Sequence, residues 1–478
     1  MQLAEYQQYD ALGLAKLIRD KEVSSLESIE CAKEAIQQYN PKINAVIEVF
    51  EQGIVTSEQS SSSDSAFSGV PFLIKDIVLQ AKGVCNEMGS RLTEGVIASH
   101  DTDLMQRFKR AGLVTIGRTT TPEFGLNIAT ESVLTGPTCN PWDTSKMAGG
   151  SSGGAAAAVA AGIVPMAHAN DGGGSIRGPA ACCGLIGLKP TRGRIPVGPD
   201  VGEVLFGLGA EFAVTRSVRD TAALLDAVQG PGVGERYMTP TPDKSYVDQI
   251  QLQTKPLKIA FTCQSWSGSP VDGEVKEALL STAKQCEALG HTLVEASPCF
   301  DYASFFKATV QHWSAGLAAW VEELGRTYGR PLDETTMEAT SLAAYEYGKT
   351  VSSSDLIGAF GVANTVSRQA GNFFQEYDVL LTPTIAHPAQ PLGTFNANDP
   401  SLSIQDWMEK LFSFTPFVAL FNMTGQPAIS LPLHRTRTGL PLGMQFVGGF
   451  ADESILLNLA AQLEEAIPWP KTAVLDRD

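Results

Sequence analysis

The sequence predicts an α/β protein with one large domain, in which helices cover both faces of a central mixed β-sheet. The chain has 478 residues, of which 43% are hydrophobic, and this is enough to bury a large core. Short apolar segments typical of strands alternate with amphipathic segments of helical spacing, an order that indicates a parallel or mixed sheet. No linker divides the chain cleanly and no internal repeat is found, so residues 1–478 are treated as one domain.

Composition excludes several classes of function. The formal net charge of −17 argues against a surface for nucleic acid or for an anionic membrane, because both require a basic patch. The eight cysteines show neither a CxxC pair nor the spacing of zinc ligands, so we expect no disulfide and no metal site. The sequence has no secretory signal pattern and no apolar run long enough to span a bilayer. These features favour a cytoplasmic protein that acts on a small, uncharged molecule.

The N-terminal part, residues 1–65, is expected to be largely helical. Apolar positions recur at helical spacing between residues 10 and 38. Ser24 and Ser25 interrupt this pattern where a second helix needs an N-cap residue. The polar stretch at 57–65 is typical of a flexible surface loop.

A lysine lies in the strand predicted at residues 69–78. Lysine is rarely buried without a partner, so Lys75, between Ile74 and Ile77, requires an explanation. One explanation is an ion pair in the core with Asp76, although neighbouring residues on a strand face opposite ways. The other is a desolvated amine whose pKa is lowered until it can act as a base. The strand pattern alone leaves both explanations open.

The other elements are predicted from periodicity and from turn residues. Residues 66–230 are expected to form the core of the site, 231–400 a variable region that shapes the pocket, and 401–478 a strand and helix that return to the core. The turn-rich stretch at 119–143 is expected to form a pocket wall, and the mostly helical stretch at 302–374 to vary with the substrate. The remaining predictions are strands at residues 45–50, 113–116, 257–261, 292–294, 378–384 and 444–447, helices at residues 103–110, 155–161, 219–228 and 274–289, and a last helix capped by Asp452.

The stretch from Asp143 to Thr191 contains two glycine clusters, each next to serines. The motif GGSSGG holds Ser151 and Ser152, and a second glycine run ends in Ser175. Glycine density of this kind suggests backbone that adopts unusual dihedral angles or approaches a ligand closely. The N–H groups of such loops can stabilise a phosphate or a reaction oxyanion, so the stretch predicts a site.

Several familiar motifs are absent from this stretch. The GxxxxGK[ST] phosphate loop, the GxGxxG dinucleotide motif and the GxSxG elbow do not match. A Ser-His-Asp triad lacks a histidine with a supporting pattern, and His168 is interpreted as a packed or loop residue. What remains is two serines and one lysine. A serine hydroxyl is a weak nucleophile until a base takes its proton, and a neutral lysine can do this.

The motifs around these residues resemble those of the amidase signature family. The matching segments are VPFLIKD at 70–76, TPEFGL at 121–126, GPTCNPWD at 136–143, GGSSGG at 149–154, DGGGSIRGPA at 171–180, CGLIGLKPT at 183–191 and LLTPT at 380–384. Several ordered motifs with the correct internal spacing are much more specific than a single glycine pattern. The resemblance implies the amidase signature fold and an amide C–N hydrolase without metal or organic cofactor.

The resemblance also implies a catalytic triad. Ser175 would be the nucleophile that forms an acyl-enzyme, and Lys75 would be the base. Ser151, which follows a cis peptide bond in this family, would relay the proton between them.

Other residues of the stretch would support this triad. The resemblance implies an oxyanion hole made by the backbone N–H groups of Gly172, Gly173, Gly174 and Ser175. The residues expected to hold the loop without taking part in the chemistry are Ser152, Asp171 and Arg177.

Two departures from the family pattern concern the substrate. Gly178 stands where many members carry a larger side chain, which predicts a wider pocket floor. The segment AHANDGGGS, which ends at Ser175, is most similar to the corresponding segment of the subgroup that contains the 6-aminohexanoate cyclic dimer hydrolases. This similarity implies a lactam or secondary amide substrate, although specificity depends on loops outside the matched motifs.

Three functions follow from these observations. The first is hydrolysis of a small carboxamide, secondary amide or lactam. The second is the glutamine-hydrolysing subunit of an amidotransferase complex, which is also found in the family and requires partner subunits. The third is a binding protein that keeps the fold without the reaction, and the presence of Lys75, Ser151 and Ser175 argues against it. A homodimer is compatible with each of them.

Overall fold

The central element of the molecule is one twisted mixed sheet. The computed structural model describes residues 1–54, 65–253, 255–473 and 475, and within them eleven strands form this sheet. In spatial order the strands are β1 (Val46–Ile54), β3 (Val114–Thr119), β2 (Pro71–Lys75), β8 (Met166–Asp171), β10 (Ala210–Thr215), β9 (Ile186–Lys189), β14 (Ala428–Arg435), β15 (Pro441–Gly448), β13 (Val379–Pro383), β11 (Lys258–Phe261) and β12 (Thr292–Glu295).

Strand directions confirm the predicted mixed sheet. β3, β2 and β8 run parallel to one another, as do β13, β11 and β12. The strands between these two groups pair antiparallel from β8 to β13, and β1 is an antiparallel edge. Because β2 and β8 are parallel neighbours, their carboxyl ends lie at the same edge of the sheet. Lys75 ends β2 and Asp171 ends β8, so the sheet brings the lysine next to the second glycine cluster.

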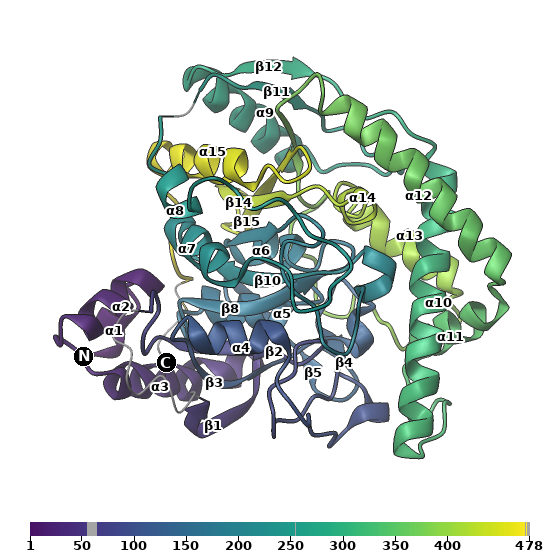
Figure 1. Cartoon of the computed structure of the whole chain (residues 1–478), viewed down its shortest axis with the longest axis horizontal. Helices are drawn as coiled ribbons and strands as arrows, with labels where there is room; N and C mark the ends of the chain where they lie inside the picture. Colours follow the sequence, from purple (N-terminus) through teal and green to yellow (C-terminus); the bar gives the residue numbers. More distant parts are fainter. Residues whose placement is uncertain (55–64, 254, 474, 476–478) are drawn as a thin grey trace.

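Helices surround this sheet on both faces (Figure 1). The helices are α1 (Leu3–Tyr6), α2 (Ala11–Arg19), α3 (Ser25–Ile43), α4 (Asp103–Arg110), α5 (Gly153–Ala160), α6 (Arg177–Cys183), α7 (Val218–Val228), α8 (Tyr246–Gln249), α9 (Gly273–Ala288), α10 (Tyr302–Tyr328), α11 (Ala339–Thr350), α12 (Ser353–Phe373), α13 (Ile404–Phe414), α14 (Leu420–Thr424) and α15 (Glu453–Ala466). Short 3-10 turns occur at Arg91–Thr93, Glu123–Gly125 and Val204–Gly207, and two small hairpins pair β4 (Glu131–Ser132) with β5 (Gly136–Pro137) and β6 (Cys139–Asn140) with β7 (Asp143–Met147).

Helix α5 packs unusually close to its neighbours because its residues are small. It reads GGAAAAVA and every one of its residues is buried. A Cβ added at Gly153 would lie 2.4 Å from Thr130 Oγ1, and one at Gly154 would lie 2.3 Å from Thr120 Oγ1. Only glycine fits at these two positions, so the first turn of α5 is held directly against the loop at 120–130.

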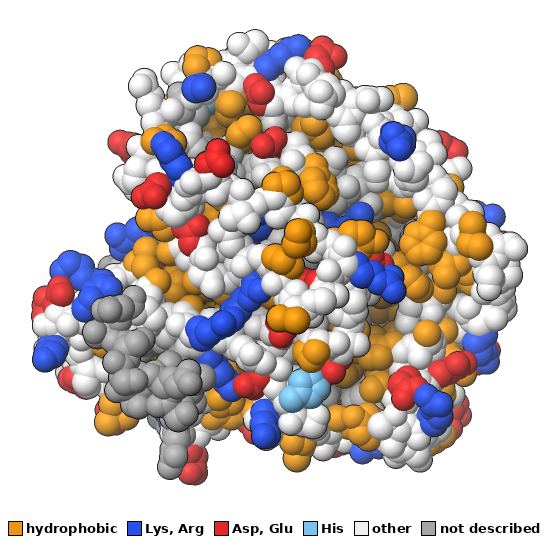
Figure 2. All heavy atoms as spheres, in the orientation of Figure 1, with side chains coloured by type: hydrophobic (Ala, Val, Ile, Leu, Met, Phe, Trp, Pro, Cys, Tyr) orange, Lys and Arg blue, Asp and Glu red, His pale blue; other side chains and the backbone are white. Residues whose placement is uncertain are grey.

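The long helices α10 and α12 form an arm at one side of the sheet, on the right in Figure 1. In the same orientation, Figure 2 shows apolar side chains gathered over this side of the face. Exposed apolar residues of α12 include Ile357 and Phe360. The prediction of a mostly helical region at 302–374 is therefore confirmed.

Most predicted elements are present within one to four residues of their expected ends, and Ser24 caps α3 by accepting a hydrogen bond from Glu27 N. Strands β8, β9, β10 and β14 and helix α6 were not predicted. Asp452 precedes α15 but its side chain does not cap the helix. The loop predicted at 57–65 lies outside the described residues except for Ser65. No helix among the described residues is long and apolar enough to cross a membrane.

Candidate active site

Lys75 lies at the carboxyl end of β2 and is completely buried. Its Nζ is 2.7 Å from Ser151 Oγ, 2.9 Å from Ser152 Oγ and 2.6 Å from Asn170 Oδ1. Burial lowers the pKa of Lys75 to about 7, although the negative charges of Glu211 and Asp171 oppose this change. A substantial fraction of this amine is therefore neutral near neutral pH.

Asp76, the alternative partner of Lys75, pairs with another residue. Its carboxylate Oδ1 is 2.7 Å from Arg118 Nη1, and the Arg118 guanidinium also contacts Glu48 and Glu87. The core ion pair between Lys75 and Asp76 is therefore excluded. Consecutive strand residues point to opposite faces, which is why the carboxylate lies away from the amine.

The first glycine cluster places Ser151 and Ser152 directly before α5. The peptide bond between Gly150 and Ser151 is cis, as the family resemblance implied. A Cβ on Gly150 would lie 2.6 Å from the backbone of Ile128, so the cluster is packed tightly against the preceding loop. Ser152 Oγ lies within hydrogen-bonding distance of both Lys75 Nζ and the Asn170 carbonyl oxygen, so Ser152 contacts the lysine directly.

The second glycine cluster is held by a buried ion pair. Asp171 accepts hydrogen bonds from Arg177 Nε and Nη2, both at 2.9 Å, and both residues are fully buried. Burial alone would raise the pKa of the Asp171 carboxyl, but the Arg177 guanidinium holds this pKa well below its usual range. Arg177 further donates to Gln445 and Asn422, and Asn422 donates to Asp171. This network fixes the loop that joins β8 to α6.

The network also decides which backbone donors face the cavity. Gly174 N donates to Asp171 Oδ1 at 2.7 Å, so its N–H group is already used and we leave it out of the oxyanion hole. Among the described residues, the N–H groups of Gly172, Gly173 and Ser175 have no hydrogen-bond partner. Gly174 has φ +126°, and a Cβ there would lie 2.5 Å from Val418 Cγ2. Glycine is therefore required at this position by the positive φ and by the close approach of Val418.

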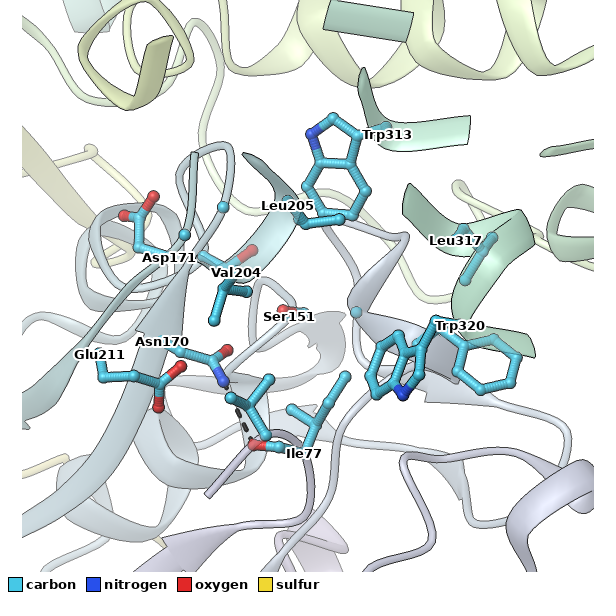
Figure 3. Close-up of a pocket in the computed structure, with 16 residues that line it drawn as sticks. Ile77, Ser151, Asn170, Asp171, Val204, Leu205, Glu211, Trp313, Leu317 and Trp320 are labelled. Carbon is cyan, nitrogen blue, oxygen red and sulfur yellow. Dashed lines mark hydrogen bonds between the residues drawn. The ribbon is translucent and has the colours of Figure 1, made fainter. Parts of the chain in front are cut away.

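Ser151 and Ser175 line the same cavity, and Figure 3 shows the position of Ser151 in it. Ser175 is 8% exposed, and within the described part of the chain its hydroxyl has no hydrogen-bond partner. The structure therefore brings the two serines to one cavity, but it does not join them by a hydrogen bond. Catalytic hydrogen bonds often form only once the substrate is bound.

The opposite wall of the cavity is apolar. Trp313, Leu317 and Trp320 recur at intervals of four and three residues along α10, so they share one helix face that is directed to the cavity (Figure 3). Val204 and Leu205 complete this wall from the turn after β9. The cavity has a volume of about 50 Å³ and adjoins an outer, mostly apolar groove of about 410 Å³ that shares Val78, Val204, Leu205 and Trp320 with it.

Two expectations about the pocket walls have different outcomes. Phe124 and Gly125 line the cavity, so the stretch at 119–143 does form a wall. Gly178 does not line it: this residue lies in α6, and a Cβ there would face the Gly150 carbonyl oxygen at 3.8 Å. The prediction that Gly178 widens the pocket floor is therefore wrong.

Two residues near Lys75 were not predicted as site residues. Asn170 lies at the end of β8 and Glu211 lies opposite it on β10. Asn170 lies in the AHANDGGGS segment. This segment differs from the common motif of the family, and the difference could have identified Asn170 as a site residue. Glu211 had no signal of its own, because the strand that carries it was not predicted. His168 is buried and packed, as interpreted, and lies between Glu211 and the backbone of Lys75.

Comparisons with known proteins show the family of this chain. A family model described as Amidase matches residues 27–457. The chain is 36% identical over 471 residues to a 6-aminohexanoate-cyclic-dimer hydrolase of Paenarthrobacter ureafaciens, and the aligned region covers 96% of this chain and 95% of the relative. The chain is also 33% identical over 496 residues to a lipoamidase of Enterococcus faecalis, and this aligned region covers 99% of the chain and 66% of the relative.

Solved structures support the same relationship. A 6-aminohexanoate cyclic dimer hydrolase complexed with substrate is 34% identical, with a TM-score of 0.91 over 97% of this chain and 98% of that one. A bacterial aryl acylamidase of the amidase signature family shares the fold, with a TM-score of 0.85 at 24% identity. The chain therefore belongs to the amidase family, the amidase signature enzymes, and is an amide C–N hydrolase.

Proposed function

We propose that Ser175 is the nucleophile of an acyl-enzyme mechanism, that Ser151 relays its proton, and that Lys75 is the general base. The observation that carries this proposal is the 2.7 Å distance between Lys75 Nζ and Ser151 Oγ, beside a cavity that Ser175 also lines. A lysine acts as a base only when it is neutral, and the pKa of about 7 for Lys75 supports this requirement.

The contacts of Lys75 leave its lone pair directed toward the relay serine. A neutral amine has two N–H donors and one lone pair. Asn170 Oδ1 accepts one N–H, while the Asn170 amide nitrogen donates to Ile77 O. Ser152 Oγ accepts the other, because the Ser152 proton is directed to the Asn170 carbonyl oxygen. The third neighbour, Ser151 Oγ, then donates its proton to the lone pair.

The proposed reaction begins when Ser175 Oγ attacks the amide carbonyl carbon. The proton of Ser175 moves to Ser151 Oγ as the proton of Ser151 moves to Lys75 Nζ. The N–H groups of Gly172, Gly173 and Ser175 stabilise the oxyanion; each such donor typically contributes roughly 3–4 kcal/mol to the transition state.

Collapse of this intermediate breaks the C–N bond. The proton returns from Lys75 along the same path to the leaving nitrogen, and an acyl ester on Ser175 remains. Water then attacks the ester carbon, with its proton taken by Lys75 through Ser151. The carboxylic acid is released and the Ser175 hydroxyl is restored.

We propose that the substrate is a small secondary amide or lactam with an apolar body. The apolar wall from α10 and the adjoining groove support an apolar substrate. The 6-aminohexanoate-cyclic-dimer hydrolases, which match almost the whole chain, support a cyclic or secondary amide.

Trapping of the acyl-enzyme tests the mechanism. The protein is incubated with a panel of primary amides, anilides, lactams and glutamine, and the Ser175 peptide is examined by mass spectrometry, with hydroxylamine as a competing nucleophile. We expect acylation of Ser175 and a hydroxamate product. Ser175→Ala should lower kcat by roughly 10⁴-fold or more, whereas Ser145→Ala, at an exposed serine outside the cavity, should retain full activity. Full activity of Ser175→Ala would refute the mechanism.

Assembly and location remain proposals. We propose that the chain acts in the cytoplasm without other subunits, as a monomer or a homodimer. Light scattering after size-exclusion chromatography distinguishes these two states, and cell fractionation tests the location. Glutamine hydrolysis that appears only with partner subunits would instead favour the amidotransferase alternative.

A further inference from the structure

Glu211 is a buried carboxylate that the proposed mechanism does not use. It lies on β10 with its Cα directly opposite that of Asn170 on β8, and its side chain lines the cavity. Figure 3 shows its carboxylate directed toward Asn170. One oxygen, Oε2, is 2.7 Å from His168 Nε2. The other, Oε1, is buried and has no hydrogen-bond partner within the described residues.

His168 does not neutralise this carboxylate. The backbone N–H of Lys75 donates to His168 Nδ1 at 3.3 Å, so Nδ1 is an acceptor and carries no proton. The ring proton is therefore on Nε2, from which it is donated to Glu211, and the imidazole in this arrangement is neutral. In this tautomer His168 therefore does not supply a positive charge to the Glu211 carboxylate.

One hydrogen-bonded route and one neighbouring residue lie between Glu211 and Lys75. His168 joins Glu211 to the backbone of Lys75, and Asn170, which lies opposite Glu211, contacts Lys75 Nζ at 2.6 Å. The other carboxylates near the base are already paired, because Asp171 binds Arg177 and Asp76 binds Arg118. In the described part of the chain, Glu211 pairs with no lysine or arginine: its Oε2 contacts His168, which is charged only when its ring is doubly protonated, and its Oε1 has no hydrogen-bond partner.

We propose that Glu211 is a positioning residue that, together with His168, stabilises the protonated form of Lys75 during turnover. This inference rests on the proposed function, because it assigns a counter-charge to the base of that mechanism. An unpaired buried carboxylate is costly, and a lysine that gains a proton supplies the missing positive charge. Glu211 raises the pKa of Lys75, and this direction is consistent with the proposed role.

The pH dependence of Glu211→Gln tests the proposal. Glutamine keeps the shape and an acceptor for His168 Nε2 but removes the charge. With a neutral amide substrate, we expect the acidic limb of kcat/KM to move about one pH unit lower, since removal of one unit charge at a separation of about 10 Å and an effective dielectric of about 20 generally changes a pKa by about this amount. We also expect kcat on the alkaline plateau to fall about tenfold. Glu211→Asp, which restores the charge, should recover most of the shift.

A matched control separates this local effect from a change in net charge. Glu465→Gln removes one negative charge at an exposed position of α15, away from the cavity, and should leave the limb in place. An unmoved limb in Glu211→Gln would overturn the proposal. So would a Glu211→Gln defect confined to KM for substrates that carry an amine, because Glu211 would then bind substrate rather than act on Lys75.

A second measurement does not depend on activity. Lysine labelled with ¹³C at Cε reports protonation by NMR, and Lys75→Met identifies the Lys75 signal. We expect its titration midpoint to be about one pH unit lower in folded Glu211→Gln. The same midpoint in both proteins would overturn the inference even if Lys75 proved not to be the catalytic base, so failure of the two proposals can be distinguished.

Discussion

The two walls of the cavity differ in almost every physical respect. One is built from the ends of β2 and β8 and the start of α6, and its side chains are ion-paired or hydrogen-bonded in a dense network around Asp171 and Arg177. The other is built from α10 and the turn at Val204–Gly207, and it presents Trp313, Leu317 and Trp320. The polar wall is held to one geometry, which the chemistry requires. The apolar wall contributes contact area and can change without loss of the reaction.

The largest effect is expected from a substitution of Lys75 in the polar wall. Lys75→Met keeps the volume of the side chain but removes the amine, so kcat should fall by roughly 10³-fold or more. Lys189→Met is the matched control: Lys189 is equally buried, and burial together with Arg177 lowers its pKa to about 7, but it does not line the cavity. We expect it to change kcat much less than Lys75→Met. Comparable losses in the two variants would mean that buried charge alone, and not position, explains the effect of Lys75.

Stability should also depend on the polar wall. Asp171→Asn leaves the buried Arg177 guanidinium without its counter-charge, and the free energy of unfolding should fall by about 3–5 kcal/mol. Chemical denaturation with parallel activity assays measures this loss. Glu277→Gln removes one partner of an exposed pair with Arg437 and should cost less than about 1 kcal/mol. Equal losses in both variants would show that the network does not hold the loop.

The pH profile tests the same wall without a mutation. In the proposed mechanism Lys75 is a base, which requires the neutral amine, and burial lowers its pKa to about 7. The rate should therefore decline below about pH 7, by roughly tenfold for each unit, and reach a plateau above pH 8. A profile of kcat/KM against pH with a non-ionising amide measures this limb. A rate that is constant from pH 5 to 9 would contradict the assigned role.

The sequence predicted the polar wall far better than the apolar one. Lys75, Ser151 and Ser175 were found because they lie in motifs with fixed spacing, and the mixed sheet followed from the order of the elements. Strands β8 and β9 were missed because they are buried on both faces and contain small residues, so they lack the alternation that indicates a strand.

The remaining contacts depend on distant parts of the chain. Glu211 lies beside Asn170 only because β10 pairs with β8 in that register. The hydrogen bond from Gly174 N to Asp171, which occupies the Gly174 N–H group, depends on the geometry of the loop. Neither fact is encoded by spacing in the sequence, since both require the folded backbone to be known.

The smallest effect is expected from the apolar wall. Trp320 lines both the cavity and the outer groove and packs edge-on against Phe124, with ring centroids 5.8 Å apart. Trp320→Ala should join the two spaces, and the kcat/KM ratio of a bulky amide to a small one should rise about tenfold while kcat for the small amide changes about threefold at most. Ile357→Ala, at an exposed residue of α12 away from the cavity, should leave the ratio unchanged. An unchanged ratio in Trp320→Ala would show that the groove does not receive substrate, whereas a large fall in kcat for both amides would show that α10 also positions the nucleophile loop.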